Sequence, residues 1–214
     1  MTSIWRISRA ASRLLALALA TALLAGCASV GPVVKIGLAA PFEGRDRAVG
    51  YDAIYAARLA VREVNARGGI DGTRVALVAL DDRGDPTLAT QTAAALVVDP
   101  GVVAVVGHYL PETTTAAADI YAKAGLPLLA AGAPPFAAAN PAALPPAFVA
   151  AYEKVTPFDE TPGPYAGPTY DAFGLLWAAL AQAEERGGEL SRASVQQALR
   201  GLEYRGVTGT VYQP

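Results

Sequence analysis

Three carboxylates stand close together in the run "DDRGDP", which makes Asp81, Asp82 and Asp85 the first residues to consider for chemistry. Carboxylate oxygens are the ligands that hard divalent cations take in proteins. The spacing therefore raises the possibility of a metal site, although no other cluster of metal-ligating residues accompanies it.

The rest of the chain offers little for catalysis. It contains one histidine, His108, and one cysteine, Cys27, so an internal disulfide is excluded and a Cys/His metal cluster is not expected. There is no G-x-S-x-G elbow, no G-x-G-x-x-G that opens a helix after a strand, and no P-loop. We predict no catalytic residue, no metal and no cofactor, with catalysis by carboxylates alone left as an alternative that no pairing supports.

Composition narrows the class of protein. The 214 residues are 53% hydrophobic and carry a formal charge of −2, which suits one α/β domain of moderate size. Neither sign of charge dominates, so nucleic acid is not an expected partner.

The N-terminus has the pattern of an export signal. Arg6, Arg9 and Arg13 precede the apolar run 14–24, which is too short for a spanning helix of about 20 residues. The run ends in "LAGC", similar to a bacterial lipobox, so we expect residues 1–26 to be a lipoprotein signal peptide. Cys27 would then carry the lipid and begin a tether, 27–33, that holds the protein outside a bacterial membrane. The alternative is an ordinary signal peptide with an incidental cysteine.

Strands and helices alternate after the tether. Continuous apolar runs at 33–42, 74–82, 102–108 and 127–132 are typical of strands that are covered on both faces. Helical patterns lie between them, at 48–66, 87–98 and 111–125; in the first, Ile54, Ala57, Val61 and Val64 share one face. This order predicts an α/β fold, a doubly wound parallel sheet with helices on both faces. Ligands of such sheets bind beyond the carboxyl ends of the strands.

The second half of the chain begins with an Ala/Pro tract at 133–146. Helices are expected at 147–155, within 163–188 and at 191–201. Ser194 and Gln197 have the spacing of a capping box in the last of these. Residues 206–214 are expected to close the chain as a short strand.

Several ordered motifs resemble one family. "VNARGGIDG" (64–72), followed by a strand and "DDRGDP", and then "VVAVVGH", is similar to the branched-chain amino-acid (leucine/isoleucine/valine) binding proteins. These are type I periplasmic solute-binding proteins of ABC importers. The similarity covers 35–132 and resumes from 147. It implies that "DDRGDP" mainly shapes a turn.

The family has two lobes, and the resemblance implies that this chain keeps one. The lobe would comprise 34–214: an N-terminal part (34–132), a junction (133–146) where most of the second lobe is missing, and a C-terminal part (147–214). The alternative is a long Pro-rich loop in an unrelated flavodoxin-like protein. The implied partners are an amino acid or related carboxylate, an ABC permease and, through the exposed hinge face, a second copy of the chain.

The resemblance also implies a ligand site at the carboxyl ends of the strands. The family's hydroxyl anchors after strands three and four are replaced here by Pro111 and Pro134. The expected ligand contacts are Phe42, Glu43, Tyr109, Pro111, Glu112, Thr113, Gly132 and Ala133. Three of them have an alternative role: Glu112 and Thr113 stabilise a helix start, and Tyr109 belongs to the core or rim. His108 is expected to be a hydrogen-bonded strand-end residue and not a ligand contact.

The helix that begins near Pro111 adds a physical reason for a site at this place. Its free amides and the positive end of its dipole favour a carboxylate, whereas Glu112 competes with an anion or pairs with an ammonium group. We predict a non-catalytic, exported solute-binding lipoprotein. The second hypothesis is a single-lobe lipoprotein that acts as a sensory or protein-interaction module without transport.

Overall fold

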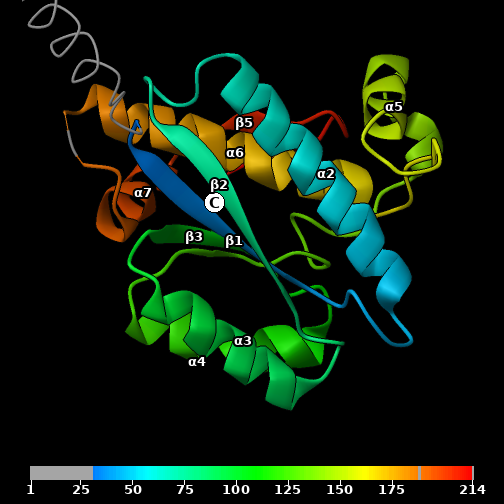
Figure 1. Ribbon diagram of the computed structural model, residues 1–214, viewed down its shortest axis with the longest axis horizontal. Helices are drawn as coiled ribbons and strands as arrows, with labels where there is room; N and C mark the ends of the chain where they lie inside the picture. Colours follow the sequence, from blue (N-terminus) through cyan, green and yellow to red (C-terminus); the bar gives the residue numbers. More distant parts are fainter. Residues whose placement is uncertain (1–30, 188, 214) are drawn as a thin grey trace, which may run out of the picture. The chain divides into compact units, whose positions relative to one another are not determined.

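A four-stranded parallel sheet lies at the centre of the protein, in the order β2-β1-β3-β4 (Figure 1). The computed structural model describes residues 31–187 and 189–213. The strands are β1 (Val33–Ala40), β2 (Arg74–Asp81), β3 (Val102–Gly107) and β4 (Leu128–Leu129). β1 pairs in parallel with β2 on one side and with β3 on the other.

Helices cover both faces of this sheet, as predicted. On one face lie α2 (Arg47–Ala66), α6 (Ala166–Glu185) and α7 (Arg192–Leu199); on the other lie α3 (Pro86–Val98) and α4 (Pro111–Lys123) (Figure 1). Side chains of β1 alternate between the two layers: Leu38 belongs to the core with α2 and α6, and Ala39 to the core with α3 and α4. The doubly wound α/β fold is confirmed.

The fourth strand is shorter than its apolar run. We expected a strand over 127–132, but only Leu128 and Leu129 pair with β3. Ala131 bridges to Phe136 instead, and Gly132 adopts φ 77°, which turns the chain out of the sheet. Hydrophobicity alone could not reveal this turn, which depends on a left-handed glycine.

The Ala/Pro tract continues into an ordered segment that covers the outer face of α2. Asn140 begins a short 3-10 helix, η1 (Pro141–Ala143), by accepting a hydrogen bond from the amide of Ala142 at 3.1 Å. Helix α5 (Pro146–Glu153) follows. Leu144, Phe148 and Tyr152 pack against the outer face of α2.

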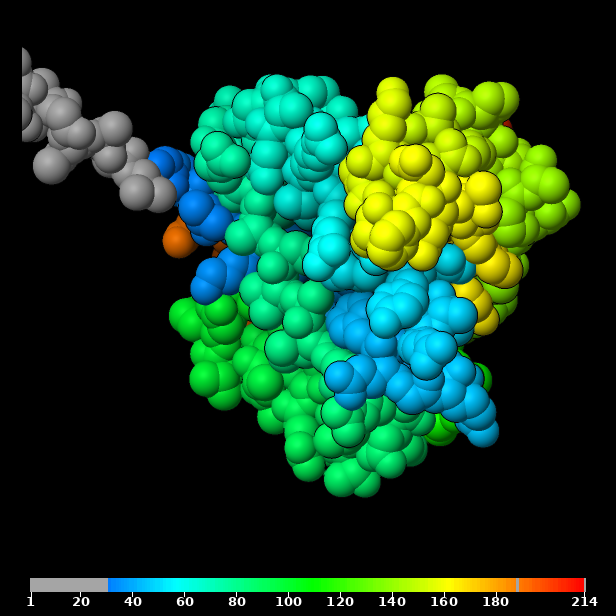
Figure 2. Space-filling view, turned by 45° about the vertical axis from the view of Figure 1, so that its right-hand side comes forward, coloured from blue at the N-terminus to red at the C-terminus, as the bar shows by residue number. Residues whose placement is uncertain are grey.

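Figure 2 shows the chain near residue 160 (yellow) lying against α2 (cyan). Residues from Pro32 on thus form one compact unit, and the tract joins its two parts. That the tract replaces a missing lobe remains a proposal.

The N-cap of the last helix, α7, lies three residues before the predicted one. Ser191 has extended φ and ψ and accepts a hydrogen bond from the amide of Ser194, while the Ser194 hydroxyl accepts one from the amide of Ser191. The predicted capping box at Ser194 and Gln197 is therefore wrong. Ser194 already lies inside the helix, and a serine took the place of the usual Glu or Gln at the third position.

The chain closes in a two-stranded antiparallel ribbon of β5 (Tyr204–Arg205) and β6 (Val211–Tyr212). The sequence predicted β6 but not β5. The ring of Tyr212 stacks on Phe136, with centroids 4.6 Å apart, so the ribbon also covers the start of the Ala/Pro tract.

The predicted signal peptide, Cys27 and residues 27–30 of the tether lie outside the described residues. Among the residues that the structure does describe, none of the helices combines the length and the apolar character needed to cross a membrane.

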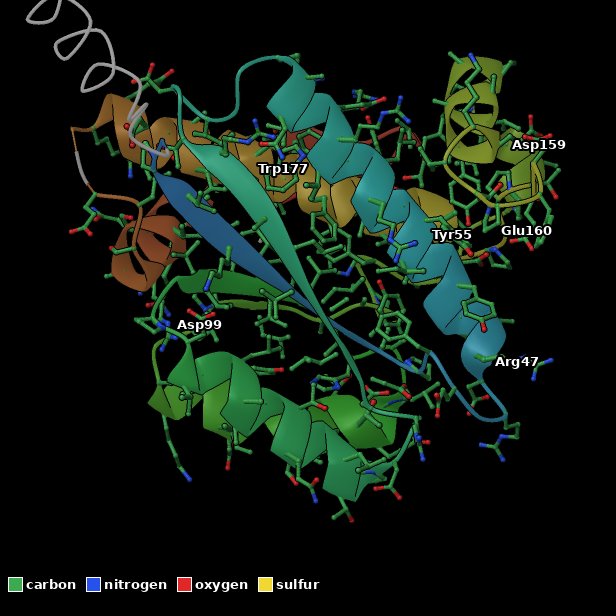
Figure 3. The ribbon with its side chains drawn as sticks, viewed as in Figure 1. Arg47, Tyr55, Asp99, Asp159, Glu160 and Trp177 are labelled. Atoms are coloured by element: carbon green, nitrogen blue, oxygen red, sulfur yellow. The ribbon has the colours of Figure 1, made fainter. Side chains whose placement is uncertain are left out.

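Asp52 joins α2 to the beginning of α6. Its carboxylate accepts hydrogen bonds from the amides of Gly163 at 3.2 Å and Tyr165 at 3.1 Å. Burial raises the pKa of Asp52; the two amides oppose this effect, and the charge of Glu160 adds to it. Figure 3 shows Glu160 beside α2, near Tyr55.

We expect the free energy of unfolding to fall, through Asp52, as the pH rises above about 4. The folded state binds the proton more tightly than the unfolded state, whose carboxyl has an ordinary pKa near 3.9, so raising the pH favours the unfolded state. Urea unfolding from pH 4 to 8 of the wild type and of Asp52→Asn measures this effect. The free energy of unfolding of the wild type minus that of the variant should decrease with rising pH. A constant or increasing difference between these free energies contradicts the prediction. Asp171, whose pKa burial also raises, is present in both proteins and cancels.

Candidate functional site

The loops that follow the four strands meet at one edge of the sheet, where α/β folds of this kind bind ligands. Gly84, after β2, lies against Leu110, after β3: a Cβ added to Gly84 would be 2.8 Å from Leu110 Cδ1 and 3.3 Å from Asp46 Oδ2. The loops after β1, β2 and β3 therefore touch one another. They form one continuous wall, which we call the strand-end wall.

Asp81 fixes the first loop of this wall. Its Oδ1 accepts hydrogen bonds from the amides of Phe42 at 2.8 Å, Glu43 at 3.4 Å and Arg83 at 2.9 Å. The Arg83 guanidinium in turn pairs with the Glu43 carboxylate at 2.5 Å. Phe42 and Glu43 thus lie at the predicted edge, Phe42 partly covered and Glu43 exposed, with the Glu43 charge already matched.

The other carboxylates of "DDRGDP" have separate roles. Asp85 caps α3 by accepting a hydrogen bond from the amide of Leu88 at 2.9 Å. Asp82 Oδ1 accepts one from the amide of Gly84 at 2.9 Å. The run therefore shapes a turn, as the resemblance implied. The described part of the chain contains no group of three or more His, Cys, Asp or Glu side chains placed to hold a metal ion.

His108 lies fully buried behind the wall. Its Nδ1 is 2.5 Å from Asp82 Oδ2, and its Nε2 is 3.1 Å from the hydroxyl of Tyr121. Burial and the charge of Asp82 raise the pKa of Tyr121, so its hydroxyl keeps its proton. The expectation that His108 is a hydrogen-bonded strand-end residue is confirmed.

Tyr109 points to the opposite side of the sheet. Its side chain is 2% exposed, its hydroxyl is 2.7 Å from Thr169 Oγ1, and its ring meets Tyr165 edge to face. Burial raises its pKa. Of the two alternatives that the sequence left for Tyr109, the structure favours the core position over a face offered to a ligand.

Gly132 lies directly behind the backbone of Tyr109. A Cβ at this glycine would be 2.0 Å from the Tyr109 carbonyl oxygen. The neighbouring Ala133 is partly covered and Pro134 is exposed. The loops after β3 and β4 are therefore in backbone contact, and the predicted residues of both belong to the strand-end wall.

Helix α4 begins at this wall without a side-chain cap. Pro111 is its first residue, and the preceding Leu110 cannot cap the free amides. Thr113 is buried, and its hydroxyl donates to the carbonyl of Leu110 at 3.0 Å, which supports the helix-start role. Glu112 is exposed and belongs to none of the ion pairs formed among the described residues.

The loops that carry the predicted contacts thus meet at one edge, but the side chains of Tyr109 and Thr113 are buried there. The structure also adds residues that the sequence did not reveal. Asp82 and Tyr121 hold His108, and Thr169 and Tyr165 hold Tyr109. Their roles depend on contacts between distant segments, for which the sequence gives no local signal. The sequence predicted a metal site or a turn for the run "DDRGDP", but not the contact between Asp82 and His108.

A separate hollow of about 550 Å³ lies away from this edge, between η1, α5 and the chain at 161–162. Its walls are mainly apolar, with Leu144 and Val149 on one side and Pro162 on the other, and Glu153 as the charged member. None of the residues that line it belongs to the strand-end wall.

Comparison with known proteins relates the chain to periplasmic binding proteins. A family model described as periplasmic binding protein matches residues 33–145. An amino acid binding protein of Pseudomonas aeruginosa is 37% identical over 93 residues, which are 44% of this chain and 25% of that protein. The Leu/Ile/Val-binding protein of Escherichia coli is 33% identical over 112 residues, 49% of this chain and 30% of that protein. The chain therefore matches less than a third of the length of these curated relatives.

The fold is shared with solved structures as well. The branched-chain amino acid transporter substrate binding protein of Streptococcus pneumoniae, solved in complex with isoleucine, has a TM-score of 0.68 and 18% identity. The superposition covers 83% of this chain and 91% of that chain. At this identity the likeness concerns the fold.

Proposed function

The chain belongs to the periplasmic binding protein family, and from this premise we propose that it is a non-catalytic, extracytoplasmic solute-binding protein of a branched-chain amino-acid-type ABC importer. The single observation that supports this proposal most is the family match, because residues 33–145 include all of the loops that build the strand-end wall up to Ala133. The proposed cargo is an amino acid or a related small carboxylate, delivered to the permease of the same system.

The strand-end wall supports a ligand that carries both charges. The uncapped amides at the start of α4 favour a carboxylate. Glu112 beside them, which forms no ion pair with another described residue, favours an ammonium group. Phe42, partly covered at the end of β1, offers apolar surface for a side chain. The strand-end wall by itself is expected to cover little of a ligand, so the described residues alone should bind more weakly than a closed cleft does.

We expect leucine, isoleucine or valine to raise the melting temperature of the purified protein. A ligand at about a hundred times its dissociation constant adds about 2.7 kcal/mol to the free energy of unfolding. For a domain of this size that is an increase of roughly 5–10 °C. Differential scanning fluorimetry with a panel of amino acids and small carboxylates measures it.

A matched pair of variants locates the binding. Glu112→Gln should reduce the shift caused by leucine, whereas Glu185→Gln, an exposed change at the far end of α6, should leave it unaltered. Equal melting-temperature shifts in both variants would show that Glu112 does not contact the ligand. A cooperative melt that no solute shifts contradicts solute binding and favours the interaction-module hypothesis.

The anchoring of the protein is a further part of the proposal. Acylation of Cys27 after removal of residues 1–26 would hold it on the outer side of a bacterial membrane. The intact mass of protein extracted from membranes decides this point: the mass of the unmodified chain contradicts the lipid anchor. The exposed hinge face remains the proposed surface for a dimer, which sedimentation analysis tests.

A further inference from the structure

A continuous line of buried polar groups runs behind the strand-end wall. Asp82 and His108 are 0% exposed and Tyr121 is 1% exposed. Since the Asp82 carboxylate can only accept, His108 Nδ1 carries the hydrogen of the 2.5 Å contact. His108 Nε2 completes the line with the Tyr121 hydroxyl at 3.1 Å.

These three residues come from different parts of the fold, whose ends meet at the strand-end wall. Asp82 directly follows β2 and donates its amide to the carbonyl of Ala40, at the end of β1, at 3.1 Å. His108 directly follows β3. Tyr121 belongs to the last turn of α4, and because helical side chains lean toward the N-terminus, its ring reaches back to His108.

The backbone of the third loop depends on this arrangement. The hydroxyl of Thr114 donates to the carbonyls of both His108 and Leu110 at 3.0 Å, and the amide of Thr114 donates to the carbonyl of Leu110 at 2.9 Å. Fixing the imidazole therefore fixes the chain on which the first turn of α4 is built. On the other side Tyr109 is held by Thr169. The loop is thus tied to both layers of helices.

We propose that His108 is a positioning residue: through Asp82 and Tyr121 it locks the loop 108–114 and the uncapped start of α4 in place before a ligand arrives. A wall that is ordered in advance loses less conformational entropy when a ligand binds, and so binds it more tightly. The effect on the loop stands by itself; the effect on affinity rests on the proposed solute-binding function.

Hydrogen exchange with mass spectrometry tests the effect on the loop. In Tyr121→Phe, which removes one hydroxyl and keeps the ring, amides of the segment 110–118 should exchange at least ten times faster than in the wild type. Peptides of α2 and α6 should be unchanged. His108→Asn keeps a donor toward Asp82 but loses the contact with Tyr121, and should act like Tyr121→Phe.

Tyr152→Phe is the matched control, since it removes a hydroxyl from another buried tyrosine, in α5, whose ring packs against α2. Exchange in the segment 110–118 should stay at the wild-type rate in this variant. Unchanged exchange in Tyr121→Phe, or an increase spread evenly over all peptides, overturns the proposal, because the network would then be a general stabiliser.

Titration calorimetry with leucine tests the effect on affinity. We expect Tyr121→Phe to raise the dissociation constant for leucine about tenfold, which is weaker binding, and Tyr152→Phe to leave it unaltered. If Tyr121→Phe loosens the loop but binds leucine as the wild type does, positioning of the ligand is refuted. If the wild type binds neither leucine nor any other solute of the panel, the proposed function fails, and the exchange data still decide whether His108 orders the loop.

Discussion

Replacing Asp171 with asparagine lowers the free energy of unfolding by about 2–4 kcal/mol, the largest loss that we expect from an isosteric change in this protein. The carboxylate is fully buried in α6 and accepts from four donors. They are the amide of Val207 at 2.7 Å, the amide of Thr208 at 3.2 Å, the hydroxyl of Thr208 at 2.6 Å and the hydroxyl of Tyr212 at 2.9 Å.

The reason lies in the direction of these bonds. Three of the four donors point at Oδ2, so the amide group of asparagine would face donors there if Oδ1 kept its bond to Val207. Buried donors without an acceptor are costly. The ribbon of β5 and β6 should detach first, because these bonds tie it to α6.

Denaturant unfolding measures this loss, and a second aspartate provides the control. Asp119→Asn makes the same chemical change on the exposed surface of α4 and should alter stability by no more than about 0.5 kcal/mol. A loss at Asp171 as small as the one at Asp119 would show that the ribbon is held by its apolar contacts, such as the stacking of Tyr212 on Phe136.

Gly132→Ala should destabilise the protein by about 2–4 kcal/mol, through contact as well as conformation. Gly132 has φ 77°, which costs an alanine about 1–2 kcal/mol. Its Cβ would also be 2.0 Å from the carbonyl oxygen of Tyr109, a backbone atom that cannot move away without moving the loop after β3.

Gly125→Ala separates the two causes. Gly125 has φ 61°, also in the left-handed region, but a Cβ there would meet no atom within 4 Å. Thermal unfolding of both variants should therefore show a loss at Gly125 that reflects the conformation alone, and a clearly larger loss at Gly132. Equal losses would mean that the loops after β3 and β4 separate easily. In the Gly132 variant we also expect weaker ligand binding, since the strand-end wall is displaced.

The sheet and its helices could be predicted because their signals are local. The apolar runs of β1 and β3 and the spaced apolar face of α2 lie within single elements, and the structure confirms them. The predicted helix 87–98 is also confirmed as α3, which begins one residue earlier at Pro86, where proline fits because its missing amide is not needed.

The contacts behind the strand-end wall could not be predicted in the same way. His108 was expected to be hydrogen-bonded, but its partners depend on how the turn after β2 and the last turn of α4 meet across the sheet. Similarly, Ser191 and Ser194 are both good capping residues and lie three positions apart, so the sequence could not show which of them caps α7. The extended backbone of Ser191 decides it. The short β4 depended on the conformation of Gly132.

The pairing of α2 with the second half of the chain affects how fast the protein can fold. Asp52 accepts hydrogen bonds from Gly163 and Tyr165, at sequence separations of 111 and 113 positions. Tyr170 donates one to Glu63 across 107 positions. Contacts of such long sequence separation slow folding, because loop-closure entropy must be lost before they form. Strands β1 to β3 are complete at residue 107, but the face of their sheet that α2 and α6 share stays only partly covered, by α2, until α6 has docked. We therefore expect that a chain in which the sheet forms before α6 docks exposes part of this apolar face, and that such chains can associate with one another until α6 has docked.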